Sequence, residues 1–183
     1  MKEKMQLYHV PIDLNRGSDK DYVLERHCRI NYACDSPWAT AIPYETYRAA
    51  WFKNAGQQAA LVSALADSRK DPRTIADIVY ADGDEPVGYL WAPFHGEDPA
   101  FVWAGVEDIY VEEEYRRKGI AAALMTYAED KARQNGAKVI RSGTGCQNIP
   151  SQAMHQKAGY KMYRVEYEKV LADAGQTPVK KIE

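Results

Sequence analysis

The stretch EEEYRRKGIAAALMTYAE, residues 112–129, passes from a basic turn into an alanine-rich helix within a few residues. Arg116, Arg117 and Lys118 come directly before Gly119, where the helix is expected to begin. The macrodipole already makes the N-terminus of a helix positive, so acidic residues are the usual choice there. A basic N-terminus therefore indicates either an ordinary basic surface turn or a site for an anion.

The residues around this turn favour close approach of a ligand to the backbone. A strand that runs through a glycine turn into a helix leaves several backbone N–H groups unpaired at one place, and such a cluster binds phosphate. Gly119 and Ala121 keep that approach open. The pattern R-x-x-G-x-A does not by itself decide between a surface turn and a phosphate site.

Two other kinds of phosphate site are excluded by their motifs. The chain has no G-x-x-x-x-G-K-[ST]. The segment SGTGCQN, residues 142–148, lacks the third glycine of a dinucleotide-binding turn. ATP and NAD are therefore poor candidates for the anion.

Length and composition are those of one ordinary globular domain. We expect a single domain over residues 1–172 and a loose C-terminal tail over residues 173–183. The 24 Lys and Arg residues are balanced by 26 Asp and Glu residues, so nothing global favours nucleic acid. No apolar run approaches the roughly 20 residues of a membrane span, and the first residues lack a secretory signal. The prediction is a cytoplasmic protein with no nucleic-acid or membrane partner.

Cysteine and histidine give no metal signature. The three cysteines are odd in number and have no C-x-x-C spacing, so we expect free thiols. The four histidines show no H-E-x-x-H pattern and no i, i+4 pair. The sequence therefore predicts no metal site.

The order of elements predicts a mixed sheet covered by helices on both faces. Apolar periodicity and turn residues predict, in chain order, a strand at 5–12, a helix from a Ser18 or Asp19 cap to 33, one kinked helix or two helices at 43–69, a hairpin at 74–94, a strand at 101–111, a helix at 119–135, a strand at 137–143, a short helix from Asn148 to Gly159, and a final strand at 160–170.

Two of these segments together resemble the GNAT superfamily of N-acetyltransferases, which move acetyl from acetyl-coenzyme A to an amine. Residues 107–124, EDIYVEEEYRRKGIAAAL, resemble its strand–turn–helix with the Q/R-x-x-G-x-G/A element. Residues 148–169, NIPSQAMHQKAGYKMYRVEYEK, resemble its terminal helix–strand unit. The resemblance covers about residues 73–170. It implies a GNAT-like three-layer α/β fold with a mixed central sheet of about six or seven strands.

The resemblance also implies where acetyl-coenzyme A, the co-substrate, would bind. The strand before the turn would hold the pantetheine arm through the backbone of Ile109 and Val111. The amides from Arg117 to Ala121 would hold the pyrophosphate, attracted by the three basic side chains. The expected coenzyme-binding residues are Ile109, Tyr110, Val111, Arg116, Arg117, Lys118, Gly119, Ile120, Ala121, Asn148 and Ser151.

Transfer to an amine requires a base. A primary amine with a pKa near ~10.4 is almost entirely protonated at neutral pH. Glu107 is the first candidate, because it lies on an otherwise apolar strand and alternates onto the same side as Ile109 and Val111. Asp108 is the second, because a β-bulge in this strand would shift the phase. A Glu107 that merely pairs with a nearby arginine is the alternative.

The expected acid differs from the family's usual residue. Seven positions after Asn148 the family usually has tyrosine, and this chain has His155. Histidine can donate a proton to a departing thiolate near neutral pH. Some aminoglycoside 6'-N-acetyltransferases are similar here, with the Ser-x-x-x-His spacing of Ser151 and His155. The alternative is a His155 ring that only packs on the coenzyme and an Asn148 that only caps its helix.

The sequence identifies the acceptor less clearly than it identifies the coenzyme site. Acidic residues near the expected site would favour a small cationic amine, similar to a polyamine or an aminoglycoside. A protein or peptide acetyltransferase, and a non-catalytic acyl-coenzyme A sensor, are the alternatives. The resemblance also makes a homodimer an expectation.

Overall fold

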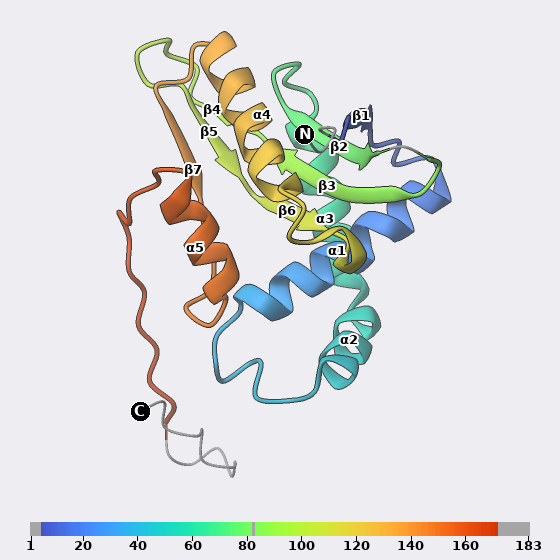
Figure 1. The fold of residues 1–183 in the computed structure, drawn as a ribbon. Coiled ribbons are helices and arrows are strands. Elements are labelled where there is room, and N and C mark those ends of the chain that lie inside the picture. Colours follow the sequence, from blue (N-terminus) through green and yellow to red (C-terminus); the bar gives the residue numbers. More distant parts are fainter. Residues whose placement is uncertain (1–4, 82, 172–183) are drawn as a thin grey trace.

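The computed structural model describes residues 5–81 and 83–171, so the predicted tail at 173–183 lies outside the described residues. Figure 1 shows the helices and strands. In chain order they are β1 (Tyr8–Pro11), α1 (Gly17–Cys34), α2 (Tyr44–Lys53), α3 (Ala55–Ser68), β2 (Ile75–Tyr80), β3 (Pro86–Ala92), β4 (Phe94–His95), β5 (Trp103–Val106), β6 (Asp108–Val111), a 3-10 turn (Glu113–Tyr115), α4 (Ile120–Gln134), β7 (Val139–Ser142) and α5 (Ile149–Lys157).

The strands form two sheets that share one stretch of chain. The first has the order β1-β2-β3-β6, with antiparallel neighbours throughout. The second has the order β4-β5-β7, in which β5 and β7 are parallel. The chain passes from the second sheet to the first at Glu107, between β5 and β6. Beyond Val106 and Ser142, the last register pair of β5 and β7, the two sheets separate.

Helices cover opposite faces of the sheets. Helices α1, α2 and α3 pack on the β1-β2-β3-β6 sheet around Leu24, Trp51 and Leu65. Helix α4 packs on the other face through Leu124 and Met125, and Met154 of α5 joins that second core. This is the predicted mixed α/β architecture with helices on both faces, and it is confirmed (Figure 1). Every helix in the described ranges is too short or too polar to cross a bilayer.

Two helix starts test the cap predictions. Helix α5 begins as predicted, because the Asn148 side chain accepts a hydrogen bond from the Ser151 amide at 3.3 Å. The prediction of Ser18 or Asp19 as the cap of α1 was wrong. Helix α1 starts at Gly17 without a side-chain cap, since Asp19 lies inside the helix and accepts the Asp13 amide at 3.0 Å. In the 43–69 segment the chain forms two helices, separated at Asn54.

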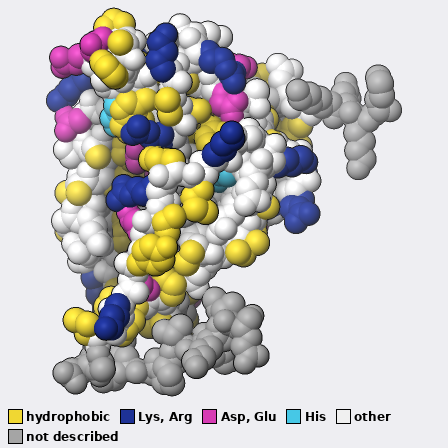
Figure 2. Space-filling view, turned by 90° about the vertical axis from the view of Figure 1, so that its left-hand side faces the viewer, with side chains coloured by type: hydrophobic (Ala, Val, Ile, Leu, Met, Phe, Trp, Pro, Cys, Tyr) yellow, Lys and Arg dark blue, Asp and Glu magenta, His cyan; other side chains and the backbone are white. Residues whose placement is uncertain are grey.

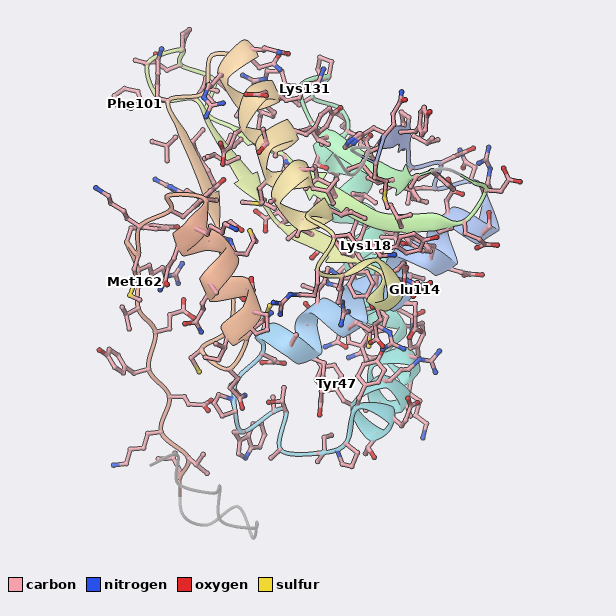
Figure 3. The ribbon with its side chains drawn as sticks, in the orientation of Figure 1. Tyr47, Phe101, Glu114, Lys118, Lys131 and Met162 are labelled. Atoms are coloured by element: carbon pink, nitrogen blue, oxygen red, sulfur yellow. The ribbon has the colours of Figure 1, made fainter. Side chains whose placement is uncertain are left out.

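The predicted final strand is the main error in the fold. Residues 160–170 form neither a helix nor a strand, and they pair with none of the described strands. Several of their apolar side chains are exposed, among them Met162 and Tyr167, which are 83% and 94% exposed. Met162 projects away from the body of the molecule in Figure 3. Alternation of residue types predicts a strand, but hydrogen bonding to a neighbouring edge is what makes one.

Candidate active site

The separation of the two sheets leaves one edge of β6 open. Strand β6 pairs with β3 on one side and with no described strand on the other. The Glu112 amide bonds to Val87 on the β3 side at 3.0 Å. Because backbone groups alternate in direction along a strand, those of Ile109 and Val111 face the open edge. These are the two residues expected to hold a pantetheine arm.

The basic turn has the backbone conformation of an anion site. Arg117 and Gly119 both have left-handed backbones, with φ values of 63° and 88°. Gly119 is the N-cap of α4 and gives no side-chain cap, so the first amides of the helix are left for a ligand. Alternating right- and left-handed residues turn successive amides towards one point, which suits an oxyanion. Figure 3 places Lys118 at this end of α4.

The basic side chains around the turn have different surroundings. Arg116 donates from Nε to the Val111 carbonyl oxygen at 3.0 Å and lies 3.7 Å from Glu113. Lys118 lies with its Nζ 4.7 Å from the Tyr115 ring centroid. Arg116 therefore holds the turn against β6, and the backbone amides are the better candidates for direct contact with an anion.

A β-bulge places two carboxylates on one face of the sheet. Asp108 is the register partner of Trp91, and the Glu107 amide donates to the carbonyl of the same Trp91 at 3.0 Å. Glu107 and Asp108 therefore both lie opposite Trp91. The alternation of side chains between the two faces of the sheet shifts by one residue there. The prediction that Glu107 shares a face with Ile109 and Val111 was wrong. Those two pack on the α4 face, whereas Glu107 lies over Gly105 on the opposite face.

Asp108 is the centre of a buried hydrogen-bond network. Its Oδ2 accepts from the hydroxyl of Tyr89 and lies 2.7 Å from Nδ1 of His27, on α1. Burial and then the nearby Asp108 carboxylate raise the pKa of Tyr89 well above its usual value, so the phenol stays protonated and donates. Asp108 is 3% exposed. It therefore anchors α1 to the sheet, and Glu107 is the carboxylate that solvent and a ligand can reach.

Asp108→Asn should lower the free energy of unfolding by about 1–3 kcal/mol, because a buried amide N–H₂ would replace an oxygen and lose the charge-assisted bonds. Urea denaturation measures this change, with Asp84→Asn in an exposed turn as the control. Any turnover of the parent chain should persist in Asp108→Asn. A loss of turnover at unchanged stability would contradict the anchoring role and make Asp108 the base.

His155 is buried and both of its ring nitrogens are engaged. Nδ1 lies 2.8 Å from the Ser151 carbonyl oxygen, which can only accept, so Nδ1 carries a proton. Nε2 lies 2.8 Å from Oγ of Ser142, the last residue of β7. Any proton that leaves Nε2 therefore passes to the Ser142 hydroxyl, which lies where the sheets separate.

The loop that follows β7 is tied to the C-terminal end of α1. Asn148 Nδ2 lies 3.9 Å from Sγ of Cys34, and Thr144 Oγ1 lies 3.7 Å from the same sulfur. A Cβ added to Gly145 would lie 2.6 Å from the Cys34 carbonyl oxygen, so only glycine fits there. Asn148 thus caps α5 and also orients this loop.

Sequence reasoning missed Ser142 and His27. Both depend on contacts between distant segments, since Ser142 meets a residue of α5 and His27 meets the bulge 81 positions away. The only available signal for Ser142 was its place at the end of a predicted strand. No group of three or more His, Cys, Asp or Glu side chains in the described chain is placed to hold a metal ion.

Comparison with known proteins matches this chain to a family and to relatives. The family model described as "Acetyltransferase (GNAT) family" matches residues 37–160. An uncharacterised N-acetyltransferase, YdgE, of Bacillus subtilis is 28% identical over 93 residues, or 49% of this chain and 57% of the relative. An aminoglycoside N(6')-acetyltransferase type 1 of Serratia marcescens is 37% identical over 57 residues, or 31% of this chain and 39% of the relative. The chain thus spans about half or less of these relatives.

Solved structures agree on the fold. A putative acetyltransferase, YycN, from Bacillus subtilis has a TM-score of 0.65 at 16% identity and covers 92% of this chain and 100% of its own. The structure of AAC(6')-Iy with a bisubstrate analogue containing coenzyme A has a TM-score of 0.54 at 16% identity, with 93% and 100% covered. At these identities the likeness concerns the fold alone.

Proposed function

Since this chain belongs to the acetyltransferase (GNAT) family, we propose that it transfers an acetyl group from acetyl-coenzyme A to a primary amine of a small molecule. One observation carries the proposal. Glu107 lies on one face of the sheet and the His155–Ser142 pair on the other, at the point where β5 and β7 separate. A thioester between the sheets would have a base on its acceptor side and an acid on its coenzyme side.

The coenzyme fits the groups that the structure leaves open. The pantetheine amides would bond to the backbone of Ile109 and to the Val111 amide on the free edge of β6, since the Val111 carbonyl oxygen already accepts from Arg116. The pyrophosphate would lie on the amides from Arg117 to Ala121, at the start of α4. AAC(6')-Iy, with the same fold, has been solved with a coenzyme A bisubstrate analogue, which supports this use of the fold.

The proposed chemistry begins with the acceptor amine. Glu107, directly or through one water, takes a proton from the ammonium and passes it to solvent, and the neutral nitrogen attacks the thioester carbonyl. Glu107 then takes the second proton from the nitrogen of the tetrahedral intermediate. We assign this role to Glu107 because Asp108 is buried and bonded to His27 and Tyr89.

The groups that protonate the leaving thiolate lie on the other face of the sheet. His155 enters this step as the imidazolium, with a proton on each ring nitrogen. As the carbon–sulfur bond breaks, the Ser142 hydroxyl gives its proton to the thiolate and receives one from Nε2 of His155, which leaves the ring neutral with its proton on Nδ1. The Ser151 carbonyl oxygen holds Nδ1 and fixes the ring orientation during this transfer. In this proposal Ser142 touches the sulfur and His155 supplies the proton.

Free-thiol release tests the proposed function. The purified chain is mixed with acetyl-coenzyme A and separate pools of polyamines, aminoglycosides, amino acids and basic peptides. Release with a small-molecule pool supports the proposal, and release with peptides alone would favour a protein acetyltransferase. Coenzyme binding without release in any pool would favour an acyl-coenzyme A sensor. A homodimer and a cytoplasmic location stay predictions from the sequence.

Gly119→Val should raise the Kd of acetyl-coenzyme A about tenfold or more, because a β-branched residue resists the left-handed backbone that aims the amides. Calorimetric titration measures it. Gly136→Val is a matched control, since Gly136 also has a left-handed backbone and open space, but lies beyond the other end of α4. Equal losses of affinity in both variants would show a stability effect and remove the turn from the site.

A further inference from the structure

One face of the β4-β5-β7 sheet carries polar and aromatic side chains, and none of the described helices packs on it. The core beneath α1, α2 and α3 contains no residue of these three strands. Ala104 and Ile140 point to the α4 face, so Trp103, Gly105 and Arg141 point to the opposite one. Glu107 lies over Gly105 on this uncovered face, which is therefore the side from which an acceptor would reach the proposed base.

This face carries one anionic and one cationic side chain that do not pair with each other. Arg141 is the register partner of Gly105, and Glu107 Oε1 lies 2.9 Å from the position that a Cβ of Gly105 would take. Both side chains are exposed. Within the described chain, neither forms an ion pair or a side-chain hydrogen bond. One anion at the bulge between β5 and β6 and one cation on β7 thus remain available to a ligand.

The arginine is held in place by stacking. Its Cζ lies 4.4 Å from the Trp103 ring centroid and 5.4 Å from that of Tyr163. Trp103 in turn stacks on His95, with centroids 4.0 Å apart and planes at 20°. A guanidinium stacked on rings keeps its N–H groups directed outward in its own plane, where a carboxylate or phosphate can accept them.

A third polar group is directed at the same place. Nε2 of His95 is buried, has no hydrogen-bond partner in the described chain, and lies 3.4 Å from the Cβ position of Gly105. A buried ring nitrogen without a partner is costly unless a ligand or water satisfies it. Any residue larger than glycine at 105 would fill the space that Glu107, Trp103 and His95 surround. A glycine inside a strand often marks such a close approach.

We propose that the acceptor carries an anionic oxygen group, a carboxylate or a phosphate, in addition to its amine. The amine binds at Glu107 and His95, and the anionic group binds Arg141. This inference rests on the proposed function and narrows its acceptor, because an acceptor with positive charges only would place one of them against Arg141. Figure 2 shows a different side of the molecule, that of α5, where basic and hydrophobic side chains also lie next to each other.

Pairs of amines that differ only in the anionic group test the proposal. Lysine is compared with cadaverine, and phosphoethanolamine with ethanolamine, as acceptors of acetyl from acetyl-coenzyme A. We expect kcat/KM to be at least about tenfold higher for the anionic member of one pair, and the pair that responds identifies carboxylate or phosphate. Equal values in both pairs, or preference for cadaverine and ethanolamine, would overturn the proposal.

Variants of Arg141 locate the effect. In Arg141→Gln the preference for the anionic acceptor should fall towards one through a higher KM, and Arg141→Lys should restore part of it. Arg133→Gln removes a cation from α4, on the opposite face of the sheet, and should leave the preference unchanged. A preference that survives in Arg141→Gln would contradict the assignment to Arg141.

A binding measurement separates this inference from the proposed function. Calorimetry with the chain saturated by free coenzyme A measures the affinity for lysine, cadaverine, phosphoethanolamine and ethanolamine without turnover. Tighter binding of an anionic member, lost in Arg141→Gln, supports the inference even if no acetyl is transferred. Acetylation of amines without this binding preference would contradict the inference but not the proposed function.

Discussion

Glu107→Gln is expected to lower kcat by about 10²–10⁴-fold, the usual contribution of a general base. Glutamine keeps the shape and hydrogen-bonding length of the side chain but cannot accept a proton from an ammonium. The bulge fixes the backbone of Glu107 through its bond to Trp91, so the variant should fold like the parent. Steady-state kinetics with a saturating amine measures the loss.

The affinity for acetyl-coenzyme A is the control for the Glu107→Gln experiment. The proposed coenzyme contacts are backbone groups of β6 and α4, which Glu107 does not touch, so the Kd of acetyl-coenzyme A should stay within about twofold. Glu97→Gln makes the same change in an exposed turn and should not alter kcat. Normal turnover in Glu107→Gln would remove Glu107 from the mechanism. A partial return of activity at high pH, where more amine is neutral, would agree with a base role.

Ser142→Ala and His155→Gln are each expected to lower kcat by about 10²-fold or more, and the double variant by no more than the worse single one. The two residues act in series in the proposal, because the proton from His155 reaches sulfur only through the Ser142 hydroxyl. Removing either one breaks the same path. Measurement of kcat for both single variants and for the double variant completes the double-mutant cycle.

Folding and binding must be separated from chemistry in these variants. His155 is buried, so urea denaturation of His155→Gln has to show a folded chain before its kcat is interpreted. Ser142→Ala is the milder change, since it only deletes a hydroxyl. If the losses in the two single variants multiply in the double variant, the residues act independently and the relay is wrong. A loss confined to the Kd of acetyl-coenzyme A would instead mean that His155 only packs on the coenzyme.

The features predicted correctly from sequence depend on neighbouring residues. The helix at 120–134 follows from its apolar periodicity, and the cap at Asn148 needs only an amide three positions away. The glycine in the basic turn needs only a left-handed backbone at one position. Such interactions are complete within one or two turns of chain, so the local sequence contains all of the participants.

The errors arose where the structure of a segment depends on residues that are far away in the sequence. Residues 160–170 alternate like a strand, yet no described edge pairs with them. The face assigned to Glu107 was wrong because the bulge is set by the pairing of β3 with β6, which changes the phase by one residue. Whether a strand is paired, and in which register, is a property of two segments and cannot be derived from one.

The sequence by itself determined the family-like order of strands and helices, the basic turn at the start of α4 and the two carboxylates at 107 and 108. Only the tertiary structure decided which carboxylate is buried, that His155 meets Ser142, and that Arg141 stands beside Gly105. The physical reason is the distance along the chain over which each interaction acts. Backbone conformation and capping are settled within a few residues, whereas burial, sheet register and side-chain pairing are settled by segments that meet only when the chain folds.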